Sequence, residues 1–231
     1  MNRPEVVSPE EWQAAHVEIL AKEKELTRAR DALSAERRRQ PMMRIEKDYE
    51  FDGPAGKVGL DGIFEGRTQL ALYNFMLAPG DADPCPGCST FTDYLGRVEH
   101  ANARDLTIAL VSRAPLEEID AVKKRMEWDY PWYSSGGTDW NEDNGFTTDR
   151  GEMFGLTMFL RDGTDVFKTW FTTHRGVEGL SALALCDVAP YGRQEDWEDS
   201  PEGWPQAPSY TVGELHDSYP PEPLVPSYAA P

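Results

Sequence analysis

Basic residues are scarce in this 231-residue sequence, which has 23 Lys and Arg against 41 Asp and Glu and a formal net charge of -18. Such an acidic surface repels phosphate groups, which argues against nucleic acid and anionic lipid as partners. Long hydrophobic runs are absent too, because none approaches the roughly 20 apolar residues that a membrane helix needs. The N-terminal stretch MNRPEVVSPEEW also lacks the apolar core of a signal peptide. We therefore expect a cytoplasmic protein with no membrane and no nucleic-acid partner.

Several catalytic signatures are also missing. The sequence has no glycine-rich nucleotide fingerprint, no G-x-S-x-G elbow and no HExxH pair, so it gives no support to phosphate, acyl-transfer or zincin chemistry. Cysteine occurs only at Cys85, Cys88 and Cys186, an odd and small number that argues against a secreted disulfide scaffold. Cys186 lies in the apolar segment LSALALCDV, where we expect a small buried thiol.

Composition divides the chain into an N-terminal arm (1–44), a main domain (45–193) and a C-terminal tail (194–231). From residue 196 onward the chain has eight Pro, seven Asp and Glu, and no Lys or Arg, so this segment cannot bury enough apolar surface to fold alone. It also carries several Trp and Tyr residues, which a freely solvated segment does not need. We expect the tail to lie in extended form over the main domain or over a neighbouring subunit.

The arm carries the signals of one long helix. Ser8 and Glu11 have the spacing of a capping box, and Pro41 is a stop signal after a stretch without Gly or Pro. At about 1.5 Å per residue this helix would run roughly 45 Å. We expect it to lie across the main domain or against a second subunit, and together with the aromatic tail it predicts a homodimer. Its basic end, Arg37 to Arg39, is an alternative site for partner recognition.

The main domain alternates apolar strands with helices. Two runs of buried-strand length, 69–76 and 106–112, are each followed by a predicted helix, 89–101 and 116–127. A predicted hairpin, 156–160 with 165–172, and a last helix, 178–188, complete the domain. This order predicts an α/β fold with a central mixed sheet flanked by helices, which is the order of the thioredoxin fold.

The strongest chemical signal is Cys85-Pro86-Gly87-Cys88, which falls between the first buried strand and the helix that follows it. If Cys85 is the N-cap, Pro86 takes the first helical position, and the positive end of the helix favours a thiolate. In Cys-X-X-Cys sites the thiol pKa can fall from about 8.5 toward 7 or lower. Cys88, one turn later, can reach Cys85 and resolve a mixed disulfide. We predict Cys85 and Cys88 as catalytic residues, with Pro86 and Gly87 contacting a small-molecule or thiol/disulfide substrate.

Two other interpretations use the same pair. Cys85 and Cys88 with an imidazole such as His174 would form a site for copper, zinc or iron, whereas a redox pair needs no cofactor. In the third interpretation the pair is structural and the protein is a non-catalytic binding module. The carboxylates of Asp81 and Asp83 disfavour a nearby thiolate, so the residues by themselves leave the choice open.

Longer segments resemble a known family. They are KEKELTRARDALSAERRR, QLALYNFM, CPGCSTFTDYL, ARDLTIALVSRAPLEEIDAVKKRM and FLRDGTDVFKTW. Over residues 18–193 the chain resembles the thioredoxin-like domain-of-unknown-function family 899, which is distantly similar to peroxiredoxins, and this resemblance implies the thioredoxin-like fold. Family members usually have His where this chain has Asn74. Thioredoxin-type oxidoreductases also place a cis-proline before the strand that faces the cysteines, but this chain has no proline between Pro131 and Pro190.

Three further features are candidates for binding. Arg113 follows the second predicted strand at its carboxyl end, where it would attract an anionic substrate, steady a thiolate or form a structural salt bridge. Trp132 and Trp140 would either line an aromatic pocket near the cysteines or close the core under a long loop. The acidic segment 139–145 matches a calcium loop only in part, so we interpret it as a solvated turn. Tyr73 is expected in the core.

Overall fold

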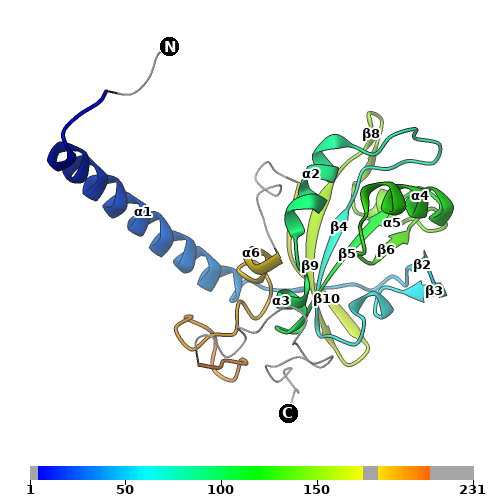
Figure 1. The fold of residues 1–231 in the computed structure, drawn as a ribbon. Helices are drawn as coiled ribbons and strands as arrows, with labels where there is room; N and C mark the ends of the chain where they lie inside the picture. Colours follow the sequence, from blue (N-terminus) through cyan, green and yellow to red (C-terminus); the bar gives the residue numbers. More distant parts are fainter. Residues whose placement is uncertain (1–4, 174–181, 209–231) are drawn as a thin grey trace.

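The computed structural model describes residues 5–173 and 182–208 (Figure 1). The helices are α1 (Pro9–Arg37), α2 (Pro86–Leu95), α3 (Glu99–Asn102), α4 (Leu116–Met126), α5 (Trp140–Asp143) and α6 (Ala182–Cys186), with a 3-10 turn η1 (Gly62–Phe64). The strands are β1 (Met43–Arg44), β2 (Glu50–Gly53), β3 (Gly56–Gly59), β4 (Gln69–Asn74), β5 (Leu106–Ser112), β6 (Trp132–Ser134), β7 (Thr147–Thr148), β8 (Gly151–Glu152), β9 (Gly155–Asp162) and β10 (Asp165–Thr172).

Eight strands form one mixed sheet in the order β1-β10-β9-β4-β5-β6-β2-β3. The central strands β4, β5 and β6 are parallel, and helices α2 and α4 lie in the two connections between them. The β9–β10 hairpin joins antiparallel on the other side of β4. This arrangement is the thioredoxin-like α/β fold with helices flanking a mixed sheet, as the order of the predicted elements had indicated.

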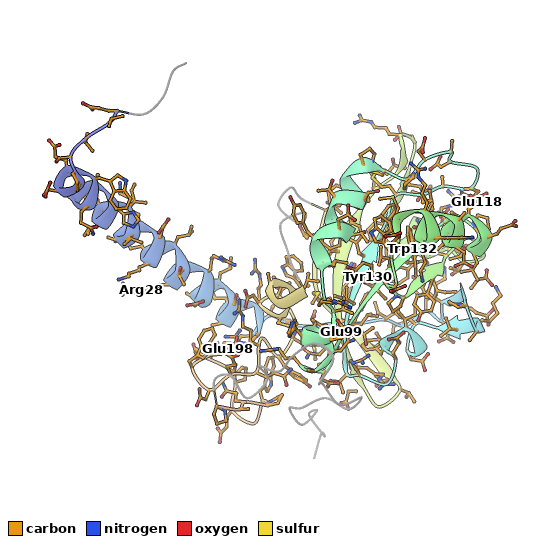
Figure 2. The ribbon with its side chains drawn as sticks, viewed as in Figure 1. Arg28, Glu99, Glu118, Tyr130, Trp132 and Glu198 are labelled. Atoms are coloured by element: carbon orange, nitrogen blue, oxygen red, sulfur yellow. The ribbon has the colours of Figure 1, made fainter. Side chains whose placement is uncertain are left out.

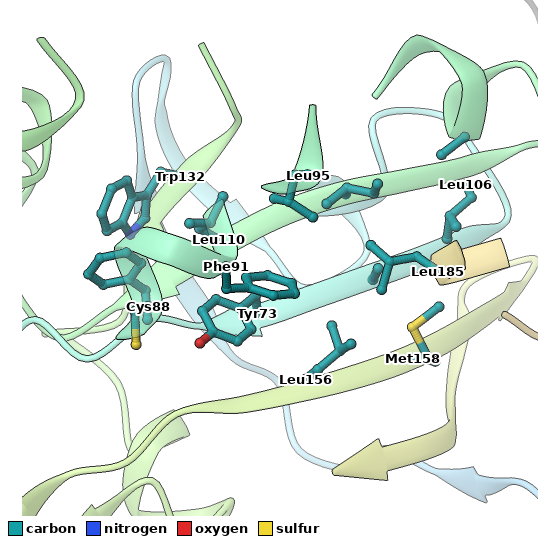
Figure 3. Packing of buried hydrophobic residues seen from close by; sticks show 14 of the residues in the cluster. Tyr73, Cys88, Phe91, Leu95, Leu106, Leu110, Trp132, Leu156, Met158 and Leu185 are labelled. Carbon is teal, nitrogen blue, oxygen red and sulfur yellow. The ribbon is translucent and has the colours of Figure 1, made fainter. Parts of the chain in front are cut away.

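The core has two clusters, one on each face of the sheet. Successive residues of β4 alternate between them, as the pleat of a strand requires, with Tyr73 in the first cluster and Leu72 in the second. Helix α2 covers the first face with Phe91 and Leu95, and Figure 3 shows them packed against β4 and β5. Because β4 is buried on both faces, its carboxyl end is a fixed platform for the segment that follows.

Helix α1 begins as predicted, with the reciprocal hydrogen bonds of a capping box between Ser8 and Glu11. It does not lie across the main domain, so that expectation was wrong: it extends away from the sheet (Figure 1), and only Ser34 and Ala35 in its last turns are buried. Its apolar side chains are spread around the helix and do not form one wide stripe, which explains why no face packs. Contact with a second subunit stays a prediction. Within the described chain, no helix combines the length and apolar character needed to cross a membrane.

The described part of the tail packs against the end of α1 and the main domain. Arg38 of the helix end forms an ion pair of 3.0 Å with Glu198, and both side chains are nearly inaccessible to solvent. Farther along, the Trp204 ring meets Tyr191 edge-on, with 5.2 Å between the ring centroids. The tail therefore does contact the body as far as Trp204, and residues 209–231 lie outside the described part of the chain.

Two predicted helices differ in extent. The helix expected over 89–101 is two helices, α2 and α3, because the chain breaks at Gly96, whose φ of 62° and ψ of -130° are not helical. Of the helix expected over 178–188, the described part is α6. Cys186 at its end is completely buried, as expected for a small thiol in an apolar segment.

Candidate functional site

The cysteine pair follows the carboxyl end of β4 and opens helix α2. Cys85 is the N-cap residue, with extended backbone angles, and Pro86 occupies the first turn. The Ser89 amide donates to the Cys85 carbonyl at 2.9 Å, which closes the first helical turn. The Cys85 side chain makes no capping hydrogen bond, so the N–H groups of Gly87 and Cys88 have no partner within the helix. The predicted position of a sulfur at the positive end of a helix is therefore formed.

The two sulfurs differ in exposure. Cys85 is half-buried, whereas Cys88 is 2% exposed and belongs to the first core cluster. Both are free thiols, and their side chains interact with each other. One residue of the pair is thus partly accessible to solvent, while the other is buried and interacts with it.

Burial raises the pKa of the Cys88 thiol to about 12, and the adjacent Cys85 contributes to that increase. Two donors act in the opposite direction: the Tyr73 hydroxyl and the Met76 amide, whose nitrogen is 3.4 Å from the Cys88 sulfur. Tyr73 also stacks on Phe91 of α2, with ring centroids 4.0 Å apart, and Figure 3 shows its hydroxyl at the same end of the cluster as the sulfur. Tyr73 is therefore a core residue, as the strand pattern predicted, whose hydroxyl also contacts the Cys88 sulfur.

These environments predict how the three thiols react. Near pH 8, about one part in ten thousand of a thiol with the pKa of Cys88, or of Cys186, whose burial likewise raises its pKa to about 12, is ionised. We expect iodoacetamide to modify Cys85 first in the folded protein, and Cys88 and Cys186 only after denaturation. Peptide mass spectrometry after a brief exposure measures this. Modification of Cys88 before Cys85 would contradict the assignment of the accessible thiol.

The segment before β9 is the place in the sequence where a cis-proline was expected. Residues 5–173 and 182–208 contain no cis peptide bond. Instead, the Asn74 side-chain amide donates to the Met153 carbonyl at 2.8 Å, and the Met153 amide donates to the Phe146 carbonyl at 2.6 Å. Asn74 is 1% exposed, so it supports this loop from inside. Both main-chain groups of Met153 are consequently occupied by the protein itself.

Arg113 forms the structural ion pair that was one of its alternatives. Its guanidinium lies 2.9 Å from Glu152, which is 8% exposed and also accepts hydrogen bonds from Asn141 at 2.8 Å and Thr147 at 3.0 Å. This network ties the end of β5 to the loop that precedes β9. A role of Arg113 toward an anionic substrate stays a prediction.

The two candidate tryptophans do not share a pocket. Trp132 is 1% exposed in the first cluster, and its indole N–H donates to the Ser112 hydroxyl at 3.0 Å. Trp140 packs on the opposite face of the sheet, with its ring centroid 5.0 Å from that of Tyr49. Of the two alternatives, closing the core is the one that the structure shows.

The carboxylates near these elements already have partners. The acidic segment 139–145 contains the short helix α5, with Trp140 and Asn141 buried, so the expectation of a solvated turn was wrong. Lys47 pairs there with Asp139 at 2.7 Å and with Asp143 at 2.5 Å. Beside the cysteines, the Asp81 carboxylate accepts from the Ala78 amide at 2.7 Å, and Asp83 pairs with Arg125 at 2.7 Å. These contacts reduce the repulsion that Asp81 and Asp83 were expected to exert on a thiolate.

Within residues 5–173 and 182–208, a metal at the cysteine pair would lack a third protein ligand. Among the described residues, no group of three or more His, Cys, Asp and Glu side chains is placed to hold a metal ion. His174, the ligand proposed from the sequence, lies outside the described residues. A metal at the pair stays a prediction.

The sheet order and the cysteine pair define a thioredoxin-like protein. The model of a family described as a bacterial protein of unknown function (DUF899) matches residues 1–219, so the chain belongs to that family. No curated protein matches the chain.

Solved structures with similar folds include peroxiredoxins and a thiol:disulfide interchange protein. Peroxidoxin BcpB from Mycobacterium tuberculosis is 16% identical with a TM-score of 0.47, covering 61% of this chain and 89% of its own. A cysteine-to-serine mutant of peroxiredoxin Q from Xanthomonas campestris is also 16% identical, with a TM-score of 0.44 and coverage of 59% and 88%. A putative DsbE from Chlorobium tepidum is 11% identical, with a TM-score of 0.43 and coverage of 60% and 91%.

Proposed function

We propose that this protein is a thiol-dependent oxidoreductase in which Cys85 attacks the substrate and Cys88 resolves the intermediate. The observation that supports this assignment is the pairing of a half-exposed sulfur at the N-cap of α2 with a buried sulfur in contact with it. The positive end of a helix stabilises the anion that the attack requires. No cofactor is needed, and the reducing compartment of the cytoplasm would supply the thiol that restores the pair.

The reaction on a disulfide balances with these two residues alone. The Cys85 thiolate attacks one sulfur of the substrate disulfide, forms a mixed disulfide and releases the other half as a thiolate, which takes a proton from solvent. Cys88 then loses its proton to solvent and attacks the Cys85 sulfur, which releases the second half as a thiol. The substrate gains two electrons, and the pair becomes a disulfide that an external dithiol reduces again.

The second step depends on the surroundings of Cys88. Burial is the largest influence that raises the pKa of Cys88, so this thiol is protonated at neutral pH until it attacks. The Tyr73 hydroxyl and the Met76 amide are donors that would stabilise the sulfur anion in the attack.

The loop before β9 favours a small substrate. An extended peptide that binds beside the cysteines would need free main-chain groups with which to pair, but those of Met153 are bonded to Asn74 and Phe146. Like Cys85, Met76 and Phe154 are partly buried apolar residues that pack against the first cluster. These neighbours fit a small, partly apolar disulfide or peroxide.

A comparison of substrates tests this proposal. With dithiothreitol as donor, we expect the specificity constant for hydroxyethyl disulfide to exceed that for the disulfides of insulin by about tenfold. This factor corresponds to the two main-chain hydrogen bonds that an insulin chain could not make with Met153. The formation of oxidised dithiothreitol, corrected for the uncatalysed reaction, gives the rate. If neither disulfide nor hydrogen peroxide is turned over, the oxidoreductase assignment fails. If insulin is preferred, the inference about a small substrate fails while the assignment survives.

A further inference from the structure

Helix α1 extends away from the main domain, and the rest of the described chain covers little of its surface. It has 29 residues, which at about 1.5 Å each make roughly 43 Å. Within residues 5–173 and 182–208, only Ser34 and Ala35 of this helix are buried. Figure 2 shows the side chains around Arg28 standing clear of the body. Because helices in proteins are stabilised mostly by packing one face against another surface, α1 is a candidate for contact with another chain.

A narrow apolar row runs along this helix. It consists of large side chains spaced seven residues apart and 45–64% exposed, namely Trp12, Ile19, Leu26 and Leu33. Seven residues make nearly two turns, so these side chains lie along one line on the helix surface. A seven-residue repeat is the pattern of a coiled-coil seam, which is narrower than the stripe that packs a helix onto a globular body. The row therefore fits another helix better than it fits the main domain.

Small residues flank the row on one side. Ala15 and Ala29 each come three residues after a member of the row, at the second position of the repeat that faces a partner helix. Alanine at this position leaves room for a large side chain of the other helix to enter. Lys22 occupies the same position in the middle of the row, four residues after Glu18. Its flexible stem can turn the amine out of the seam toward that carboxylate.

An antiparallel second copy of α1 would match this surface. When the two-fold axis of such a pair passes beside Lys24, Ile19 lies opposite the partner's Ala29. In the next layer, Leu33 lies opposite the partner's Ala15. Each of these large side chains then meets a small one, which lets the two helices interdigitate without overpacking. Because the two-fold axis repeats every contact, one row on one helix supplies both halves of the interface.

The charges of α1 favour the antiparallel orientation. Residues 9–21 carry three Glu and no Lys or Arg, whereas residues 28–37 carry three Arg against one Asp and one Glu. A parallel pair would place the three carboxylates of one copy beside the same three of the other, and like charges placed together oppose association. In an antiparallel pair they lie beside the part that contains the arginines. The helix dipoles also point in opposite directions, so each positive end lies beside a negative one.

We propose that α1 pairs with α1 of a second copy of this chain as an antiparallel two-helix coiled coil. The row from Trp12 to Leu33 forms its seam. The two main domains would lie at opposite ends of the paired helices, because each is attached to the C-terminal end of its own α1 (Figure 1). The pairing is independent of the cysteine chemistry, since Cys85 and Cys88 belong to the main domain and no residue of the seam does.

Sedimentation equilibrium of the whole protein tests the pairing. At about 50 μM, above the Kd of a micromolar dimer, we expect twice the 26.0 kDa of one chain. Ile19→Asp should raise the Kd of the dimer at least about a hundredfold, because pairing would bury two unpaired carboxylates. The matched control is Val17→Asp, since Val17 is 53% exposed against 51% for Ile19 but lies about 200° away around the helix. This variant and Cys85→Ser should both remain dimers.

Engineered cysteines test the orientation. In protein with Cys85 and Cys88 both changed to serine, oxidation of a mixture of Ala15→Cys chains and Leu33→Cys chains should give a disulfide-linked dimer, because these two positions face each other. Ala15→Cys chains alone should not link, since the two copies of that position would be about 27 Å apart along the seam. A mass other than that of two chains for the unaltered protein, equal effects of Ile19→Asp and Val17→Asp, or preferential linking of Ala15→Cys chains to each other would overturn the proposal.

Discussion

Replacing Cys85 with serine should lower the turnover of a small disulfide by at least about a thousandfold, as loss of a catalytic nucleophile usually does. A serine hydroxyl is not ionised at neutral pH and cannot form a mixed disulfide. Because Cys85 is half-buried at a helix end and the change retains its size, thermal stability should hardly change. The measurement is the steady-state formation of oxidised dithiothreitol, corrected for the rate without protein.

Two further variants make this result specific. Pre-reduced Cys88→Ser protein, freed of dithiothreitol, should release about one equivalent of thiol per chain from the disulfide and then stop, because the first step needs only Cys85. Cys186→Ala should retain full turnover, since Cys186 is buried in α6 and belongs to no described contact with the pair. Full turnover by Cys85→Ser protein would exclude Cys85 as the nucleophile, and equal losses in all three variants would indicate a structural effect.

Replacing Glu198 with glutamine should lower the free energy of unfolding by about 3–5 kcal/mol. Glu198 is 2% exposed and lies 3.0 Å from Arg38, which is 3% exposed. The substitution leaves the Arg38 guanidinium buried without a carboxylate, and Figure 2 shows Glu198 where the tail meets the end of α1. Urea unfolding followed by circular dichroism measures the change.

The neighbouring pair is a matched control. Arg39 and Asp199 form an ion pair of 2.6 Å with side-chain exposures of 44% and 76%, so Asp199→Asn should cost less than about 1 kcal/mol. Changing Arg38 to Met and Glu198 to Leu together should recover much of the stability lost in Glu198→Gln, because no unpaired charge remains buried. Equal effects of Glu198→Gln and Asp199→Asn would show that burial of the Arg38 pair has no special importance.

Local signals in the sequence predicted much of this fold. The capping box at Ser8, the position of Cys85 before Pro86, and the turn between β9 and β10 are each specified by residues close together in the chain, and each forms as expected. The order of strands and helices then restricts the sheet to a few topologies. The thioredoxin-like arrangement follows from these elements before any distance is known.

Features that depend on distant contacts could not be predicted in the same way. A tyrosine in a buried strand has the same apolar pattern whether its hydroxyl meets a sulfur or not, so Tyr73 was interpreted only as core. Arg38 and Glu198 are 160 positions apart, and no local pattern joins them. The prediction that helix α1 lies across the main domain was wrong, because the spacing of apolar residues shows which of them share a face but not whether another surface covers that face.

Peptide mapping of Cys88→Ser protein after reaction with hydroxyethyl disulfide tests the central assignment most directly. We predict a mixed disulfide on Cys85, stable until dithiothreitol is added, with Cys186 unmodified. An adduct on Cys186, or the absence of any adduct on a folded protein, would contradict the assignment of Cys85 as the attacking thiol.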